Sequence, residues 1–492
     1  MFRIPSRALL ALLIALIALP LLANSNGGND DDETRFENKY SRDLTYRGGR
    51  VTIDHSFGSL TVRPGSGSTV QVRATIRSSN ASIGREIHIV TEEGAGGVTI
   101  RTDFPEIRNW HGSLSYSVDM TVTVPPNAPV TAKNRFGNID VRGLQINCIV
   151  ENRQGSIVVE NLRGAALSNT FGSIEATDIR GDLAVNNQNG SVTVRKAEGA
   201  VTVANRFGSV EVSDVKRGAT ISNSNGSIDA MDISGALKAT SAFGNVKAST
   251  ITGTADVTTS NARVDLANIG GAATVRNSFG TVTVNTVNGD LTVDSGNSRV
   301  DAENIRGDAD IETSFGAINL KNVSGIATLT TTNGNVKVSD VGGTLSVETR
   351  FGSVKADRIR GTADVDSSNG SVTLGDITGN VKVKANFGSV FVDGASAGVD
   401  VSNSNGAISV ANLRGSGCHP LALRTTFSSI KVGVAEGAGY NVNARTTFGR
   451  INTDFPVTTT SMSEGSMVGT IGRGGCKMDL TNANGSITIE KD

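Results

Sequence analysis

The feature that most constrains this chain is an internal repeat of 18 residues. Two successive units read FGSVEVSDVKRGATISNS, starting at Phe207, and NGSIDAMDISGALKATSA, starting at Asn225. One column of the repeat holds Ile or Val in every unit from Ile174 to Ile408. A register kept over so many units predicts stacked and nearly identical layers, each stabilised by its neighbours.

Within each unit the apolar residues are spaced by two, which is the period of a β-strand. Ile174 and Ala176 form one such pair, Leu183 and Val185 form another, and the residues between them are mostly polar. Each unit therefore predicts two short strands with one buried face each. The expected fold is an all-β, parallel β-solenoid with about 18 residues and two strands per rung, stacked about 4.8 Å apart.

Two turns separate the predicted strands. The first contains Asp or Asn followed by Gly, as in residues 177–181 (TDIRG), where we expect Asp178 to bond nearby backbone and Gly181 to adopt a positive φ. The second is built mostly on FG or NG. Its first position alternates between Phe and Asn in this order: Phe171, Asn189, Phe207, Asn225, Phe243, Asn261, Phe279, Asn297, Phe315, Asn333, Phe351, Asn369, Phe387, Asn405.

The alternation leaves a second rung size open, namely four strands and 36 residues, in which Phe would stack directly on Phe. Aromatic residues make up only 4% of the chain, and Ala, Val, Ile and Leu fill the apolar columns. Because interiors are close-packed and these side chains are small, they would leave a wide rung underfilled. The smaller rung is therefore favoured.

The N-terminal residues have the layout of a secretory signal. Arg3 and Arg7 precede an apolar run over residues 8–19, which is short for a bilayer span of about 20 residues, and Pro20 and Ala23 follow. An uncleaved anchor is the alternative.

The sequence predicts five segments, assigned from composition and periodicity. They are a signal peptide (1–23), a flexible acidic linker (24–46), an N-terminal β-meander or cap (47–130), regular solenoid repeats (131–414), and irregular C-terminal rungs with a cap (415–492).

The chain has three cysteines. Cys418 and Cys476 lie in irregular C-terminal segments, and export would make a disulfide between them possible. The sequence favours this pair but leaves the pairing open. Cys148 then stands alone and is expected to be a buried small apolar residue.

Parts of the chain resemble a known family. Residues 117–126 (SVDMTVTVPP), residues 136–141 (FGNIDV) and the run of (F/N)GS(I/V)xV units are similar to the bacterial putative-adhesin domain, a β-strand-repeat family of unknown function. The resemblance covers roughly residues 47–492. It implies an exported surface or periplasmic β-repeat protein, and it supplies no catalytic residues.

The residues offer little chemistry for an enzyme. The four histidines, His55, His88, His111 and His419, form no pair at metal-ligand spacing, and no catalytic motif is evident. A carbohydrate-active enzyme on a β-helix scaffold is the alternative, but its carboxylates should form an aperiodic cluster, whereas Asp and Asn here recur in register at turns. We therefore predict no enzyme and no cofactor. A net charge of −1, without a basic stripe, argues against a nucleic-acid partner.

One acidic patch departs from this regularity. Five carboxylates should project outward from the second strand of two successive units, and hard divalent cations favour such clusters. They are Asp290, Asp294, Asp308, Asp310 and Glu312. The patch is a candidate metal site, and a solvated acidic face is the alternative.

Outward Thr residues at 202, 220, 274, 292 and 328 suggest an ice-binding solenoid as a further alternative, although Lys238, Asp256, Asp310 and Lys382 interrupt them. The favoured function is an exported structural or interaction module. It would be adhesin-like and would bind through the ladder faces of the solenoid. The expected location is periplasmic, cell-surface or extracellular. The expected partner is an unidentified protein or polysaccharide of the envelope or surface, and the mature chain should lack a transmembrane domain.

Overall fold

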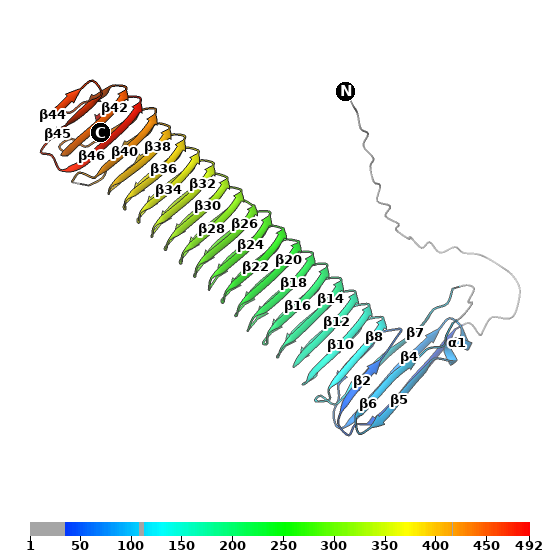
Figure 1. Cartoon of the computed structure of the whole chain (residues 1–492). Helices are drawn as coiled ribbons and strands as arrows, with labels where there is room; N and C mark the ends of the chain where they lie inside the picture. Colours follow the sequence, from blue (N-terminus) through cyan, green and yellow to red (C-terminus); the bar gives the residue numbers. More distant parts are fainter. Residues whose placement is uncertain (1–34, 108–112, 416) are drawn as a thin grey trace, which may run out of the picture.

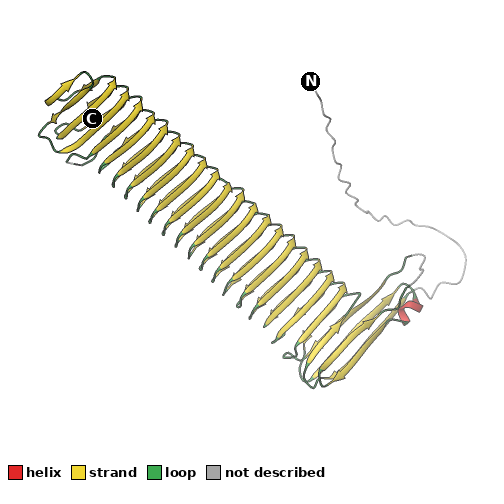
Figure 2. Cartoon of the chain, in the orientation of Figure 1, coloured by secondary structure: helices red, strands yellow, loops and turns green. Residues whose placement is uncertain are grey.

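The computed structural model describes residues 35–107, 113–415 and 417–492. It is a straight rod made of two long β-sheets that face each other (Figure 1). Strands dominate, and the described residues contain one short helix, α1 (Ala81–Arg85), near the N-terminal end (Figure 2). The predicted signal peptide, residues 1–23, lies outside the described residues.

One sheet contains mainly odd-numbered strands and the other mainly even-numbered strands, with exceptions at both ends of the rod. In stacking order the first sheet contains β1 (Phe36–Thr45), β4 (Thr69–Ser78), β7 (Tyr116–Val124), β3 (Leu60–Pro64), β9 (Ile139–Arg142), β11 (Ile157–Leu162), β13 (Ile174–Ile179), β15 (Val192–Ala197), β17 (Val210–Val215), β19 (Ile228–Ile233), β21 (Val246–Ile251), β23 (Val264–Ile269), β25 (Val282–Val287), β27 (Val300–Ile305), β29 (Ile318–Val323), β31 (Val336–Val341), β33 (Val354–Ile359), β35 (Val372–Ile377), β37 (Val390–Asp393), β39 (Ile408–Ala411), β41 (Ile430–Val434), β47 (Ile487–Lys491) and β43 (Ile451–Thr453). The second contains β5 (His88–Gly94), β6 (Gly97–Asp103), β2 (Arg50–Asp54), β8 (Val130–Phe136), β10 (Asn147–Gln154), β12 (Gly164–Phe171), β14 (Leu183–Asn189), β16 (Val201–Phe207), β18 (Ala219–Asn225), β20 (Leu237–Phe243), β22 (Ala255–Asn261), β24 (Ala273–Phe279), β26 (Leu291–Asn297), β28 (Ala309–Phe315), β30 (Ala327–Asn333), β32 (Leu345–Phe351), β34 (Ala363–Asn369), β36 (Val381–Phe387), β38 (Val399–Asn405), β40 (Leu421–Phe427), β46 (Cys476–Asn484), β42 (Tyr440–Phe448), β45 (Ser466–Ile471) and β44 (Val457–Ser463).

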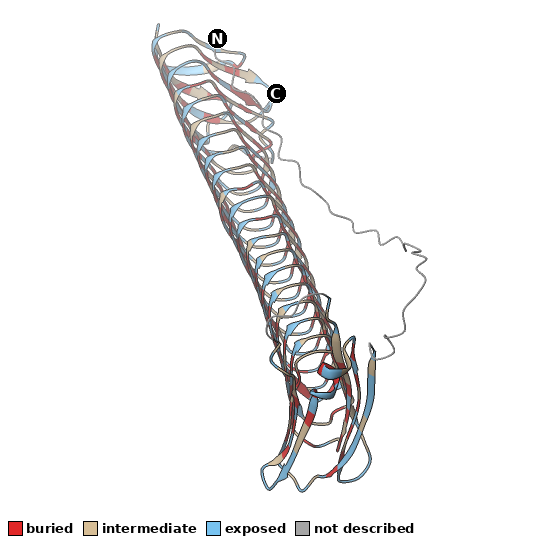
Figure 3. Ribbon diagram, turned by 90° about the vertical axis from the view of Figure 1, so that its right-hand side faces the viewer, coloured by how far each residue is buried: buried red, intermediate tan, exposed pale blue. Residues whose placement is uncertain are grey.

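The strand register settles the size of the rung. Ile174 lies opposite Val192, and Leu183 lies opposite Val201, so neighbouring strands are related by 18 residues. The parallel β-solenoid with two strands per rung is confirmed, and the 36-residue rung is wrong. The apolar columns of both sheets form one buried core cluster. Buried positions recur in rung after rung along the rod (Figure 3). Small side chains suffice there because the two sheets face each other directly.

The first turn differs from the sequence prediction in one respect. Asp178, with φ of 55°, adopts the left-handed conformation, whereas Gly181 does not. Asp and Asn tolerate this conformation better than most residues, which explains their recurrence at this position. Gly181 serves close stacking instead, because a Cβ there would lie 2.5 Å from the carbonyl oxygen of Arg163 in the preceding rung.

Part of the predicted flexible linker is ordered, which corrects the 24–46 boundary. Strand β1 pairs antiparallel with β4 from Phe36 opposite Ser78 to Thr45 opposite Thr69. Leu44 on β1 is fully buried. The sequence of β1, FENKYSRDLT, lacks the alternation of apolar and polar residues that marks a strand, because most of its side chains remain exposed.

Both ends of the rod depart from sequential stacking. At the N-terminal end the rung formed by β2 and β3 lies between the β6/β7 rung and the β8/β9 rung. At the C-terminal end the last rung of the chain, β46 and β47, lies between β40/β41 and β42/β43. Antiparallel strands then cover the ends: β1, β4 and β5 at one, β44 and β45 at the other. Such strands limit end-to-end pairing between rods.

No helix within the described part of the chain is long and apolar enough to cross a membrane.

Candidate functional site

The predicted acidic patch consists of two different groups of carboxylates. Asp290 and Asp308 belong to turns, where Asp290 Oδ1 accepts a hydrogen bond from the Asp308 N–H at 2.9 Å. Asp308 Oδ1 in turn accepts one from the Ile326 N–H at 2.7 Å. These two side chains therefore satisfy backbone donors of the following rung.

The remaining three carboxylates lie on the outer face of the second sheet. Asp294 on β26 lies directly opposite Glu312 on β28, and Asp310 lies opposite Thr292. All three side chains are exposed. Among the described residues, no group of three or more His, Cys, Asp or Glu side chains could hold a metal ion. The patch thus combines two structural aspartates with three exposed carboxylates, and the metal site stays a prediction.

His55 and His88 lie near the N-terminal end of the rod, and His419 lies near the C-terminal end. His55 is fully buried, its Nδ1 lies 3.2 Å from Thr102 Oγ1, and burial lowers its pKa to about 4. His419 Nε2 donates to the Arg414 carbonyl oxygen at 2.6 Å, and His88 is exposed on β5. His111 lies outside the described residues. These environments are those of structural or solvated histidines.

The favoured cysteine pairing is confirmed. Cys418 and Cys476 form a disulfide with a Cα–Cα distance of 5.6 Å. It links the segment before β40 to the first residue of β46. Cys148 is a free, buried thiol whose pKa is raised to about 12 by desolvation, so it is a poor nucleophile.

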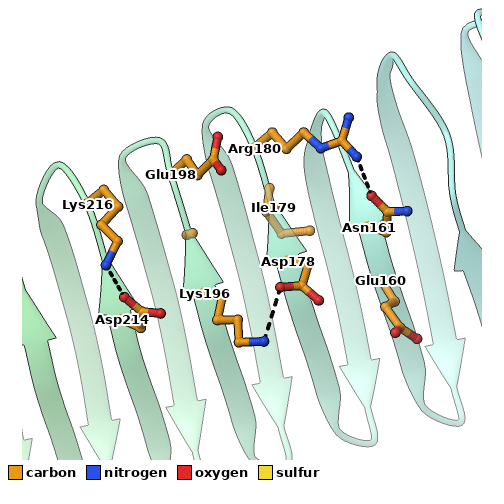
Figure 4. Close-up of a pocket in the computed structure, with 10 residues that line it drawn as sticks. Glu160, Asn161, Asp178, Ile179, Arg180, Lys196, Glu198, Asp214 and Lys216 are labelled. Carbon is orange, nitrogen blue, oxygen red and sulfur yellow. Dashed lines mark hydrogen bonds and ion pairs between the residues drawn. The ribbon is translucent and has the colours of Figure 1, made fainter.

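A shallow groove runs along the edge formed by the first turns. Figure 4 shows the charged side chains that line it near β13, β15 and β17. Lys196 Nζ lies 3.6 Å from Asp178 Oδ1, Lys216 pairs with Asp214, and Arg180 donates to Asn161 Oδ1 at 2.9 Å. Exposed pairs of this kind contribute little to stability, because solvent screens them. The groove is therefore lined by surface contacts that recur from rung to rung.

The outward Thr column also lies where the sequence placed it. Thr202 lies opposite Thr220, and Thr274 lies opposite Thr292. Lys238 and Asp256 occupy the rungs between these two pairs. The charged residues therefore break the flat Thr array that an ice-binding face would need.

The opposite edge of the rod carries the alternating Phe and Asn residues. We call this surface the aromatic edge; it comprises the residues at the first position of the second turn, where the even-numbered strands end. Its exposed phenylalanines have relative exposures between 42% and 73%. They are Phe171, Phe207, Phe243, Phe279, Phe315, Phe351, Phe387, Phe427 and Phe448.

A buried polar column that was not predicted from the sequence lies beneath the aromatic edge. It lies two residues before the edge position and holds Asn, Ser or Thr in nearly every rung. Asn152 Nδ2 donates to the Gly137 carbonyl oxygen at 2.9 Å, and Asn223 Nδ2 donates to that of Gly208 at 2.8 Å. These asparagines thus satisfy carbonyl groups of the turn in the preceding rung, whereas Ser241 and Thr259 of the same column make no such bond. In each unit this polar column follows the last apolar column by two residues, so the period of the strand could have predicted that it is buried.

Glycine allows the second turns to stack closely. Gly208 has φ of 110°, and a Cβ there would lie 2.4 Å from the Gly190 carbonyl oxygen. The edge therefore combines closely stacked backbone with one outward side chain per rung.

Among the comparisons with known proteins, one family model matches the C-terminal part of the chain. Residues 342–490 match the Toastrack DUF4097 family. This Toastrack match confirms the resemblance to a β-repeat family of unknown function. The curated proteins contain no match.

Three solved structures are similar to the chain at low identity. A putative cell adhesion protein from Clostridium sporogenes ATCC 15579 has 7% identity and a TM-score of 0.20, covering 93% of this chain and 100% of its own. A putative adhesin from Bacteroides fragilis NCTC 9343 has 12% identity and a TM-score of 0.18, covering 56% of this chain and 97% of its own. A putative adhesin from Parabacteroides merdae ATCC 43184 has 10% identity and a TM-score of 0.19, covering 56% of this chain and 96% of its own. TM-scores this low do not establish a common arrangement in space.

Proposed function

We propose that this protein is an exported, non-catalytic interaction module of the cell envelope or surface, adhesin-like in its role. The observation that carries the proposal is the uninterrupted register of the rod. From β8 to β39, parallel strands follow one another in both sheets, and the described residues between them form only short turns. A rod of this kind holds the same outward side-chain position at equal intervals over its whole length.

Two further features support export. Residues 1–23 have the composition of a secretory signal peptide. The disulfide between Cys418 and Cys476 is of a kind that persists in oxidising compartments and is rare in the cytosol.

The proposal is tested by location and by binding. The full chain, produced in a bacterial host, should lose residues 1–23, and mass spectrometry of the N-terminus checks this. Purified residues 24–492 should then bind isolated cell envelopes saturably, whereas the same protein after unfolding and alkylation should not. An intact Met1 in cytoplasmic protein, or binding that does not saturate, would contradict the proposal.

A further inference from the structure

The alternation on the aromatic edge is a property of the folded surface and not only of the sequence. In the chain, the order at the C-terminal end is Phe427, Phe448 and Asn484, which breaks the alternation. In the structure, Asn484 lies opposite both Phe427 and Phe448, because its rung is inserted between theirs. Phe and a polar residue therefore alternate in space up to the end of the edge.

The rung itself does not require this two-rung period. Phe207 and Asn189 occupy the same position of the same turn, opposite each other, and each precedes a glycine with positive φ. Asn189 Nδ2 donates to the Thr170 carbonyl oxygen at 3.3 Å. With one rung every 4.8 Å or so, successive phenylalanines are about 9.6 Å apart.

The edge is aromatic and polar, and the charged side chains at its positions are arginines. We consider the edge residue, the one before it and the two after it in each rung from Phe136 to Phe448. These positions hold Phe, Asn, Gln, Ser, Thr, Gly, Ala and Arg, and they include no carboxylate. Aromatic faces, amides and hydroxyls are the groups that recognise sugars, since a sugar ring has apolar C–H faces and a rim of hydroxyls.

We propose that the aromatic edge binds an extended β-1,4-linked glycan, with one disaccharide for every two rungs. The disaccharide repeat of such a chain has nearly the length of two rungs. Its alternate sugars turn the same face to one side. Each Phe packs against the apolar face of one sugar, and the Asn in the next rung bonds hydroxyls of the sugar between. This inference rests on the proposed function and names its ligand class.

The geometry predicts a specific dependence on glycan length. Each added disaccharide reaches one more Phe, so the affinity should rise by about fivefold per disaccharide until the edge is filled. Calorimetry of residues 24–492 with β-1,4-linked N-acetylglucosamine oligomers of increasing length measures this. Oligomers of α-1,6-linked glucose, whose repeat does not match the edge, should bind without such an increase.

Matched variants separate the edge from the rest of the surface. The double variant Phe279→Asn and Phe315→Asn places the native residue of the neighbouring rungs at both positions, so it should fold. Phenylalanines remain on both sides of the gap, so the loss of affinity, about tenfold or more, should appear with oligomers too long to fit on either side alone. Phe391 is also exposed but projects from the face of β37, away from the edge. Phe391→Asn should bind as the native chain does.

A third variant distinguishes the glycan from a second copy of the chain. Asn297→Phe inserts a ring between Phe279 and Phe315 and halves the aromatic spacing. A glycan should gain no affinity from it, whereas apolar association between two rods should become stronger, which sedimentation would detect. Self-association that is abolished by the double variant would overturn the glycan proposal, as would affinity independent of oligomer length. If envelope binding persists unchanged in the double variant, the proposed function stands and this inference fails.

Discussion

At the residue scale, the left-handed position of the first turn shows how one backbone requirement selects side chains. Most rungs place Asp or Asn there, but Thr250 has φ of 56° and Thr286 has φ of 63°. A β-branched residue is strained in this conformation, because its branched Cβ approaches the following carbonyl group. These two rungs should therefore carry local strain that their neighbours lack.

Replacing Thr250 by Asn should stabilise the rod by about 1 kcal/mol, because Asp232 and Asn268 already occupy this position in the adjacent rungs. The urea midpoint of unfolding measures the change. Thr258→Asn is the matched control, since Thr258 is exposed within β22, where β-branched residues are favoured. A lower midpoint for the Thr250 variant would show that the strain argument is wrong.

The buried His55 should make the N-terminal end sensitive to acid. Its pKa in the folded protein is about 4, below the ordinary value of 6.5, chiefly because burial disfavours the charged ring. Between pH 6.5 and 4 the unfolded chain therefore binds a proton that the folded chain does not. This contribution to stability is complete above pH 6.5 and falls by about 3 kcal/mol as the pH drops to 4.

Hydrogen exchange of strands β2, β6 and β8 at pH 7 and pH 5 measures this dependence. His55→Gln should weaken the end at both pH values and make its stability less dependent on pH. An unchanged pH dependence in the variant would assign the acid sensitivity to other groups.

At the element scale, the ends of the rod are built by insertion. The rung of β46 and β47 has strands on both sides, so the C-terminal part of the chain is held inside the stack. The disulfide joins this rung to the segment before β40. It thereby fixes which rung the last strands pair with, a choice that the 18-residue register alone leaves open.

Removing the disulfide should loosen the C-terminal rungs and leave the middle of the rod intact. The bridge spans 58 residues, for which chain entropy predicts a loss of about 4 kcal/mol in the double variant Cys418→Ser and Cys476→Ser. Hydrogen exchange should accelerate in β42–β47 but not in β20–β30, because each rung contacts only its neighbours. Cys148→Ala should leave exchange at the C-terminal end unchanged. Uniform acceleration along the rod would contradict this local account.

At the scale of the whole molecule, stability is a sum over equivalent rungs, so the chain should tolerate changes of length in whole rungs. Deleting residues 207–242 removes two rungs and joins Arg206 to Phe243 in register. The shortened rod should fold and be about 9.6 Å shorter, as small-angle scattering can measure. Deleting residues 207–215 instead should unfold the neighbouring rungs, because turn residues enter strand columns. Folding of the nine-residue deletion alone would refute the role of register.

Deleting residues 207–224 removes a single rung and should also fold, but it places Asn189 beside Asn225 on the aromatic edge. This variant keeps the core register and breaks only the two-rung period, so glycan affinity should fall for oligomers long enough to cross the junction.

The amino-acid sequence by itself determined the regular part of this protein. We could derive from it the apolar columns, the rung of two strands and the positions of the two turns, because each recurs in every unit. The favoured cysteine pair could also be derived, because both cysteines lie in irregular segments. The Phe/Asn alternation was also visible. The sequence did not show that the phenylalanines are half-exposed, that Asn187 and its column are buried beneath them, or that Asp178 carries the positive φ.

Only the tertiary structure decided the stacking order at the two ends and the pairing of β1 with β4. Every rung presents nearly the same columns, so its apolar pattern fits many possible neighbours equally well. Which rung lies next to which depends on covering the open strand edges and, at the C-terminal end, on the disulfide. That long-range choice places Asn484 between Phe427 and Phe448, and it completes an edge that the order of residues in the chain interrupts.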